Sequence, residues 1–513
     1  MRFKFLFPLL CMSLGLGCVS PAFAEGTEKS TMKIKPIYGE EKPVVALNYT
    51  GLDMSGLDQM NLRFGSSGYG DMNMTGGCSI TFAEYRDGTV GAVRNMDLQA
   101  TPFCSYEMFI RPGENVKYPT WGIAYTGMDT EDYKTILKND ITDERYAAIP
   151  FTATDSMSFG KNEKGEDASL YCAILMRTEQ LDENGDYTWV CSGTNPGAPI
   201  RCCTQSVTTL IATQCLTIDE ALKYVGAVDE DYVRIFPEDA PVLDVYTFNI
   251  EMGDIHNHWF ECCAMEDSTG RHGVLEFIDN YAIWHEGIDY SFNFFLQKDY
   301  FLNEDGTYKE QYGAGLGRYE ATVPYLDQIH TVSDHVALMD GIRYSYMTYY
   351  NEEAGYIGHD WLGNPVDWRS EFVHCDAFSG ANKFKNILGF DTTEADRKFP
   401  LWSNYLNTET GEIVKVDSLD DYLENRDHLQ SIWTLNYVMD EANREEITTF
   451  LRWSGAVYCT LTTEQVASTS SGWETYFRVI ADPMHGTVTR WFNEDVTTAD
   501  TISRVTWEDL LNP

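Results

Sequence analysis

The residues from Cys78 onward alternate between apolar and polar positions. Ile80 and Phe82 are apolar with polar neighbours, and a second apolar stretch begins at Val90. Between the two stretches lies Asp87-Gly88, a dipeptide typical of a two-residue hairpin turn. We therefore predict a β-hairpin whose two strands pair about this turn.

Helical and strand patterns mix along the rest of the chain. The run Thr217-Ile218-Asp219-Glu220 is a capping box, which predicts the first turn of a helix. Residues 351–430 are rich in Gly, Asn and Asp and weakly periodic, and we predict that they form an insertion. The mixture predicts an α+β layered fold in a single domain. Helices are predicted over 206–215, 217–225 and 333–350, and strands over 259–265, 274–278, 432–438, 457–461 and 476–480.

The N-terminus has the pattern of a secretory signal peptide. A basic start, Met1-Arg2-Phe3-Lys4, precedes an apolar run from Leu6 to Val19, and Ala22-Phe23-Ala24 fits a small-x-small cleavage site. We predict that residues 1–24 are removed and that the protein is exported, to the periplasm or the medium. No later segment reaches the roughly 18 uninterrupted apolar residues of a spanning helix, so no membrane anchor is expected.

Composition and charge narrow the choice of function. The chain has 513 residues, of which 43% are hydrophobic and 23% charged, as in globular proteins with a buried core. Its formal net charge of -42 repels phosphate backbones and anionic lipids. Nucleic acids and membrane surfaces are therefore not expected as partners. The sequence leaves the oligomeric state open, a homo-oligomer included.

The cysteine content raises the question of which thiol is reactive. Of 13 cysteines, Cys11 and Cys18 lie in the predicted signal peptide, which leaves an odd number in the exported chain. Export permits disulfides, and an odd count leaves at least one thiol unpaired while all the others can pair. No cysteine or histidine pairs have the spacing of a zinc site, and neither a metal nor an organic cofactor is expected.

Cys78 is the candidate because of the residues around it. A two-residue turn places it directly opposite Asp97, with Arg94 nearby, although a strict pleat puts Arg94 on the other face. Cleavage between Gly77 and Cys78 would free an α-amine beside the thiol. The ordinary pKa of an α-amine is about 7.7, which suits a general base at neutral pH. The alternative is that Cys78 begins an ordinary strand and that Arg94 and Asp97 form a structural ion pair.

These residues closely resemble the opening of the choloylglycine hydrolase family. The resemblance lies in Cys78-Ser79-Ile80, Asp87-Gly88 and Arg94-Asn95-Met96-Asp97, at the spacing found in that family. The family includes bile salt hydrolases and penicillin V acylases, which are N-terminal-nucleophile hydrolases of αββα fold. Further likeness runs in pieces over much of residues 78–492 and includes Phe159–Gly165, Thr217–Ala221 and His258–Glu276.

The resemblance implies a set of site residues. Asn162 matches an Asn that serves the oxyanion hole in the family. Asn293 is the match to a second oxyanion Asn, although the Thr that precedes it in the family is absent here, and Arg318 matches a later active-site Arg. Asn195 is a rival for an oxyanion role, but Asn-Pro more often marks a turn. The implied catalytic residues are Cys78, Arg94, Asp97, Asn162, Asn293 and Arg318.

The resemblance also implies an activity and a processing scheme. We expect an exported cysteine amidohydrolase acting on linear C–N amide bonds, with a small-molecule N-acyl substrate such as a conjugated bile salt, penicillin V or an acyl homoserine lactone. Residues 25–77 would be a propeptide removed by autocleavage, and their Gly-rich end predicts a flexible, exposed connection. Residues 78–513 would form the catalytic domain. The alternatives are a dipeptidase with an N-terminal Cys and a secreted binding protein in which Cys78 is buried and uncut.

Overall fold

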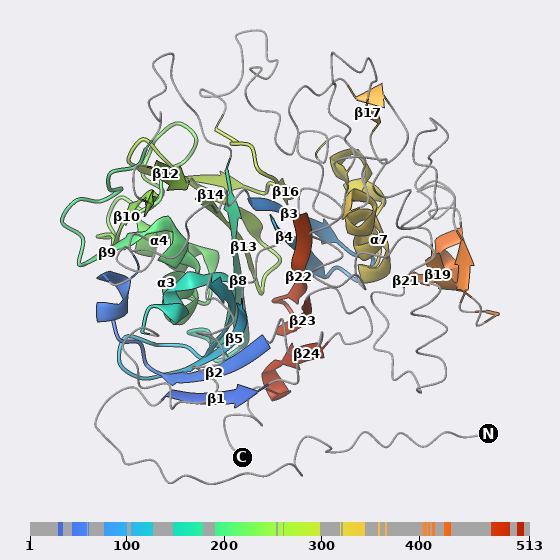
Figure 1. The fold of residues 1–513 in the computed structure, drawn as a ribbon, viewed down its shortest axis with the longest axis horizontal. Coiled ribbons are helices and arrows are strands. Elements are labelled where there is room, and N and C mark those ends of the chain that lie inside the picture. The colour runs from blue at the N-terminus through green and yellow to red at the C-terminus, as the bar shows by residue number, and fades with distance from the viewer. Residues whose placement is uncertain are drawn as a thin grey trace.

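The computed structural model describes a little over half of the chain, and Figure 1 draws the fold. The predicted signal peptide, Arg318 and the predicted strands over 432–438 and 457–461 lie outside the described residues. The described residues are 29–33, 44–58, 60, 76–99, 104–126, 147–177, 190–252, 255–259, 261–297, 319, 322–343, 358–359, 365–366, 404–407, 409–410, 413–415, 425–431, 473–492 and 500–506.

Two β-sheets form the centre of the molecule. The first has nine strands in the order β1-β2-β5-β6-β7-β8-β13-β14-β15, and the second has six in the order β16-β3-β4-β22-β23-β24. The strands of the first are β1 (Lys29–Lys33), β2 (Val44–Thr50), β5 (Cys104–Arg111), β6 (Thr120–Thr126), β7 (Ala153–Lys161), β8 (Asp167–Met176), β13 (Glu261–Asp267), β14 (His272–Ile278) and β15 (Tyr281–Glu286). Those of the second are β16 (Tyr290–Ser291), β3 (Gly76–Glu84), β4 (Val90–Gln99), β22 (Trp473–Asp482), β23 (Thr487–Phe492) and β24 (Asp500–Ser503).

Helices cover the outer face of each sheet. Helices α3 (Val207–Gln214) and α4 (Ile218–Val225) pack on the nine-stranded sheet, and α7 (Val332–Arg343) packs on the six-stranded one. Thr217 caps α4 by accepting a hydrogen bond from the backbone N–H of Glu220, as the capping box predicts. The layers therefore run helix, sheet, sheet, helix from left to right in Figure 1, which confirms the predicted four-layer αββα fold.

Strand β8 shows how the sequence pattern builds two cores. Its side chains alternate, so Leu170 and Cys172 join the core beneath α3 and α4, whereas Tyr171 and Ala173 join the core between the two sheets. A strand buried on both faces reads as a continuous apolar run, as β8 does. At β8, the nine-stranded sheet is thus buried on both faces.

The hairpin of β3 and β4 differs from the prediction by one residue. Tyr85 closes a three-residue loop, with its N–H donating to Thr89 and its carbonyl accepting from Gly88, whose φ is 84°. A left-handed Gly at this place forms a bulge, so the loop adds one residue to the predicted turn. Cys78 therefore pairs with Met96 instead of Asp97, and Asp97 pairs with Gly77.

Part of the segment before Cys78 packs into the fold, whereas most of its Gly-rich end, the predicted exposed connection, lies outside the described residues. Strand β2 pairs in parallel with β5, and β1 pairs with β2 at the sheet edge. Leu47, Leu52 and Met60 are each no more than 2% exposed and belong to the core beneath α3 and α4. At least residues 44–60 are therefore an integral part of the fold.

Small separate sheets and helical turns complete the described fold. Two of the sheets, β17/β18 and β19–β21, lie within or beside the predicted insertion and outside the two main sheets. The sheets are β9/β10, β11/β12, β17/β18 and β20-β19-β21, with β9 (Ile200–Cys203), β10 (Leu243–Tyr246), β11 (Phe248–Met252), β12 (Ile255–Trp259), β17 (Gly358–His359), β18 (Pro365–Val366), β19 (Asn404–Asn407), β20 (Ile413–Lys415) and β21 (Leu429–Ser431). The 3₁₀ turns are η2 (Ile149–Thr152), η3 (Thr204–Ser206), η4 (Val323–Gln328) and η5 (Arg426–His428).

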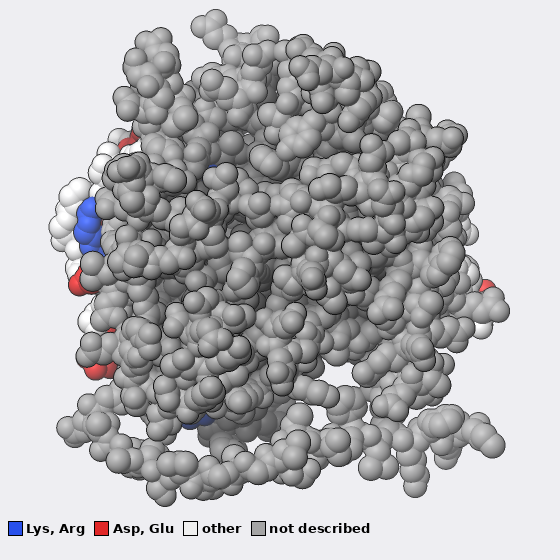
Figure 2. All heavy atoms as spheres, viewed as in Figure 1, with Lys and Arg blue, Asp and Glu red and all other residues white. Residues whose placement is uncertain are grey.

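The described part of the surface mixes charges of both signs. At the left margin of Figure 2, where described side chains are visible, basic and acidic groups lie near one another. Arg271, for example, forms exposed ion pairs with Asp219 and Glu286. Among the described residues, no helix has the length and apolar character needed to cross a membrane.

A buried ion pair joins the two sheets through β5 and β23, neither of which neighbours the strand of Cys78. Glu107 of β5 accepts two hydrogen bonds from Arg490 of β23, and a third, at 2.8 Å, from the indole of Trp121. Both charged side chains are at most 6% exposed. Removing one partner from a buried pair leaves an uncompensated charge, which is far more costly than losing an exposed pair.

We predict that Arg490→Met lowers the free energy of unfolding by about 3–5 kcal/mol. Combining it with Glu107→Gln, which keeps an acceptor for Trp121 and removes the charge, should recover part of that loss. Denaturant unfolding measures both, with Lys161→Met in the exposed Lys161–Asp167 pair as the control, expected to cost about 1 kcal/mol or less. If the loss of unfolding free energy in the double variant equals the sum of the losses in the two single variants, the prediction is wrong.

Candidate active site

Cys78 lies near the start of β3, facing the core between the two sheets. Its side chain is 1% exposed and belongs to that core. The Sγ atom is 3.3 Å from the Sδ atom of Met96 and 3.7 Å from Nη2 of Arg94. A guanidinium at this distance favours the thiolate, which is the nucleophilic form of cysteine.

The corrected register explains how Arg94 reaches the thiol. Arg94 pairs with Ile80, and residues opposite one another or two apart share one face of a sheet. Cys78, Ile80, Arg94 and Met96 thus lie on the same face, which the two-residue turn did not allow. The Nη2 atom of Arg94 also donates to the carbonyl of Ile174 on β8 at 2.7 Å, so Arg94 bridges the two sheets.

Asp155 on β7 is the charged partner of Arg94. Its Oδ2 atom is 2.9 Å from Nη1 of Arg94, and both side chains are fully buried. Tyr171 and Thr154 donate hydrogen bonds to the carboxyl group at 2.5 and 3.1 Å. Burial raises the pKa of Asp155 above its ordinary value, while Arg94 and the hydrogen bonds oppose that shift. Sequence reasoning missed Asp155, whose only signal is a carboxylate in the middle of a strand.

Asn293 contacts the backbone of Cys78. Its Oδ1 atom accepts a hydrogen bond from the N–H of Cys78 at 3.2 Å, and its Nδ2 donates to the carbonyl of Met176 at 2.8 Å. The second bond orients the amide so that its oxygen faces Cys78. Asn293, which the sequence motif singled out, thus lies beside Cys78, where it accepts a hydrogen bond from the backbone nitrogen.

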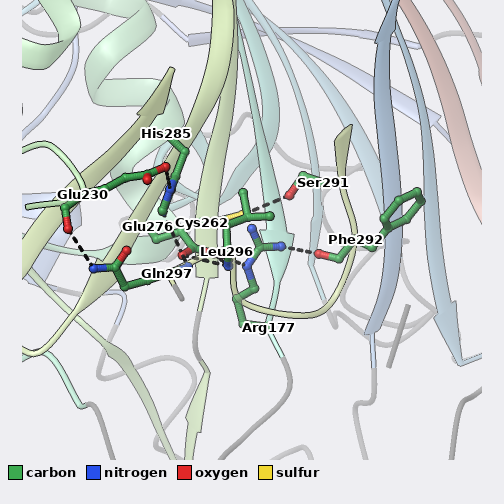
Figure 3. A network of polar contacts seen from close by, with 9 residues as sticks. All are labelled: Arg177, Glu230, Cys262, Glu276, His285, Ser291, Phe292, Leu296 and Gln297. Atoms are coloured by element: carbon green, nitrogen blue, oxygen red, sulfur yellow. Dashed lines mark hydrogen bonds and ion pairs between the residues drawn. The ribbon is translucent and has the colours of Figure 1, made fainter. Parts of the chain in front are cut away.

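A buried charged network holds the loop that carries Asn293, and Figure 3 shows it. Arg177 pairs with Glu276 at 3.0 Å and donates to the carbonyl of Phe292, the residue before Asn293. Glu276 also accepts from the backbone N–H groups of Leu296 and Gln297 at 2.9 to 3.1 Å. The loop is thereby fixed on both sides of Asn293.

His285 completes this network on β15. Its ring nitrogens lie 3.1 Å from Glu276 and 3.0 Å from Glu230. Burial lowers the pKa of His285, but the two carboxylates outweigh it and hold the pKa above the ordinary 6.5. Burial likewise raises the pKa of Glu276, but Arg177 and His285 outweigh it and lower the pKa. The charged form of each group is thus stabilised by the other.

The structure does not bring Asn162 to Cys78. Asn162 lies in the turn between β7 and β8, where its side chain bonds Lys164 and Glu166 and its own N–H donates to the carbonyl of Glu166. The turn is at the far end of β8 from Ile174, a distance of roughly 23 Å at about 3.3 Å per residue. A role for Asn162 beside Cys78 is therefore not compatible with this position.

Neither Asn195 nor Asp97 has a described side-chain contact with Cys78. Asn195 is engaged in a loop, where its Nδ2 donates to the carbonyls of Val225 and Leu243 at 2.7 and 2.8 Å, as expected for a turn residue. Asp97 lies on β4 opposite Gly77, and its side chain is outside the described part of the structure.

Export permits disulfides, but eight of the described cysteines, Cys78 among them, are buried and form none. Burial raises the pKa of several others, to about 12 for Cys203 and Cys262 and about 11 for Cys191. Within the same part of the chain, no cluster of three or more His, Cys, Asp or Glu side chains is arranged to hold a metal ion.

The arrangement defines the class of fold to which the site belongs. A cysteine near the start of a strand, facing the space between two sheets that helices cover on both sides, is the architecture of the N-terminal-nucleophile hydrolases. The fold is therefore the four-layer αββα fold of that class, and Cys78 lies near the start of one of its inner strands.

Comparison with solved structures finds two kinds of hydrolase. Two variants of conjugated bile acid hydrolase from Clostridium perfringens are 14% and 13% identical, over 83% of this chain and 92% of theirs, each with a TM-score of 0.30. Penicillin V acylase from Agrobacterium tumefaciens is 10% identical, over 83% of this chain and 86% of its own, with a TM-score of 0.30. No protein-family profile and no curated protein sequence matches the chain.

We predict that Cys78 is alkylated faster than the other described cysteines, since its sulfur lies 3.7 Å from the guanidinium of Arg94, whereas burial raises the pKa of Cys191, Cys203 and Cys262. Brief iodoacetamide treatment near neutral pH, followed by peptide mapping, measures the rate at each cysteine. Arg94→Met should slow labelling at Cys78, and Arg201→Met, near the surface and away from any described active-site contact, should not. Equal labelling of Cys78 and Cys172 would contradict the prediction.

Proposed function

We propose that this protein is an exported cysteine amidohydrolase, a distant member of the choloylglycine hydrolase family, and that it cleaves linear C–N amide bonds. The observation that carries the proposal is the arrangement at Cys78. Its sulfur lies beside Arg94 and its nitrogen beside Asn293, so thiol and nitrogen are oriented independently. An ordinary strand cysteine needs neither contact.

The proposed reaction begins with maturation. The thiol of Cys78 attacks the carbonyl of Gly77, the acyl group moves from nitrogen to sulfur, and water hydrolyses the resulting thioester. The Gly77–Cys78 bond is thereby replaced by a carboxylate on Gly77 and an α-amine on Cys78. The motif Gly76-Gly77 suits this step because two residues without side chains leave the carbonyl accessible and the backbone free to bend.

The same groups then act on substrate. The α-amine takes the thiol proton as the sulfur attacks the amide carbonyl, and it passes that proton to the leaving amine. Water hydrolyses the acyl-enzyme and releases a carboxylic acid. Asn293 would hold the amine by accepting a hydrogen bond from one of its N–H groups. Arg94 would stabilise the thiolate, and Asp155 balances the positive charge of Arg94.

An aromatic cluster beside the Asn293 loop favours an apolar acyl group. The rings of Tyr290 and Tyr319 are 4.9 Å apart, and Phe294 is 5.9 Å from Tyr319. Tyr290 and Tyr319 are half-buried, so their rings are accessible to a ligand. Aromatic faces bind apolar bodies with little loss of conformational entropy. Conjugated bile salts and penicillin V both join such a body to an amide.

We predict that the purified protein has an N-terminus at Cys78 and hydrolyses at least one N-acyl amide, and that Cys78→Ala abolishes both. N-terminal sequencing and a panel of conjugated bile salts, penicillin V, acyl homoserine lactones and dipeptides test this. Hydrolysis of dipeptides alone would favour the dipeptidase alternative. Cleavage in Cys78→Ala would show that another protease makes the cut, and full activity in that variant would refute the mechanism.

For Asn293 we predict that replacement by Ala lowers kcat by about 10²–10³ with less effect on KM. Asn293→Asp keeps an oxygen for the amine, so it should retain more activity and shift the acidic limb of the kcat/KM profile to higher pH, since a carboxylate raises the pKa of a neighbouring amine. If Asn293 instead donates to the oxyanion, Asp should be as inactive as Ala and the limb should not move. Asn162→Ala serves as the control and should have nearly full activity.

A further inference from the structure

The segment before Cys78 contributes side chains to the core beneath α3 and α4. Tyr49, Leu52 and Leu57 are 2%, 2% and 8% exposed, and Met60 is fully buried. Their neighbours in that core come from β5, β8, β13 and the two helices, all of which follow Cys78 in the sequence. Ser206, at the start of α3, donates a hydrogen bond to the sulfur of Met60 at 3.0 Å.

The backbone of this segment is also bonded to the rest of the chain. Strand β2 aligns with β5 over its whole length, from Val44 opposite Ser105 to Thr50 opposite Arg111. The N–H of Gly51 donates to the carbonyl of Arg111 at 3.0 Å, and that of Leu52 donates to the carbonyl of Glu114 at 2.8 Å. Without β2, one edge of β5 would lose all of these partners.

Glycines allow the closest approaches across this contact. A Cβ atom at Gly51 would come within 2.7 Å of the backbone of Glu114, and one at Gly113 within 2.7 Å of the backbone of Gly51. A Cβ atom at Gly56 would come within 2.3 Å of the carbonyl of Ala147. Such distances leave no room for a side chain, so the segment before Cys78 packs closely against the residues that follow Cys78.

We infer that the segment before Cys78 stays bound after the Gly77–Cys78 bond is cut, so that the mature protein consists of two chains. The inference rests on the proposed function for the position of the cut, and it replaces the expected release of residues 25–77. The bound segment would act as a structural subunit: it supplies β2 to the sheet and closes the core beneath α3 and α4.

The first experiment uses the full chain expressed with its own N-terminus in a secreting host. We expect denaturing mass spectrometry to find two fragments, beginning at Glu25 and Cys78, and native mass spectrometry to find their complex. A native mass equal to residues 78–513 alone would overturn the inference. The complex should separate only in denaturant, and at the concentration at which the catalytic chain unfolds.

A second experiment separates retention from self-cleavage. In a Cys78→Ala chain, a recognition sequence for a specific protease is placed between Met60 and Gly76, and the purified protein is cut in vitro. Co-elution of the two fragments supports retention even where the wild-type chain does not cut itself, an outcome that would count against the proposed function alone. Elution of the small fragment by itself overturns the inference.

Neighbouring residues of one helical turn provide matched variants. Leu57 is buried in the core, whereas Asp58 next to it is exposed. Leu57→Ala should weaken binding of the cut fragment by at least about thirtyfold, as expected for a buried Leu-to-Ala change, and Leu57→Asp should release it. Asp58→Asn should have no effect. Equal retention in Leu57→Asp and Asp58→Asn would show that core burial does not hold the segment.

Discussion

The buried ion pair between Arg94 and Asp155 is the interaction on which the site depends. It joins the two sheets beside Cys78, and it brings the guanidinium within 3.7 Å of the sulfur. A single buried charge would be too costly to retain there, so Arg94 needs a carboxylate from the opposite sheet. The second pair between the sheets follows the same division, with Glu107 on the nine-stranded sheet and Arg490 on the six-stranded one. The two buried ion pairs thus fix the position of one sheet relative to the other, which apolar contacts alone would define less strictly.

The other half of the site depends on a different network. Cys78 lies on a strand, but Asn293 lies on a loop, and a loop needs partners to keep one conformation. Glu276 supplies them by accepting from Arg177, His285 and two backbone N–H groups of the loop. Since the loop in turn orients the nitrogen of Cys78, residues without any contact to the thiol determine how its amine would be directed. Precise placement of a catalytic group commonly requires support of this kind.

The proposed cut before Cys78 would separate a segment that is packed into the fold. A propeptide that merely blocks the nucleophile can leave without cost, whereas one that supplies a strand and core side chains cannot. The free thiols are consistent with this emphasis on packing. Burial raises the pKa of Cys203 and Cys262, which keeps these two thiols in the neutral form, and the core around them is held by apolar contacts without a disulfide.

A resemblance between motifs, rather than a local pattern, singled out Cys78, Arg94 and Asn293 as candidates. The sequence by itself determined the layered α+β class, the capped helix at Thr217 and the existence of the hairpin that begins near Cys78. These features follow from local patterns, which act over a few residues and need no distant partner. The tertiary structure alone decided the rest. One left-handed glycine, Gly88, shifted the register and placed Arg94 on the face of the thiol. Asp155 and Glu276 have no motif because their partners are far along the chain, and Asn162 lies at the wrong end of a long strand. Burial, register and charge pairing between distant segments cannot be read from residue order, because they arise only when the two sheets pack.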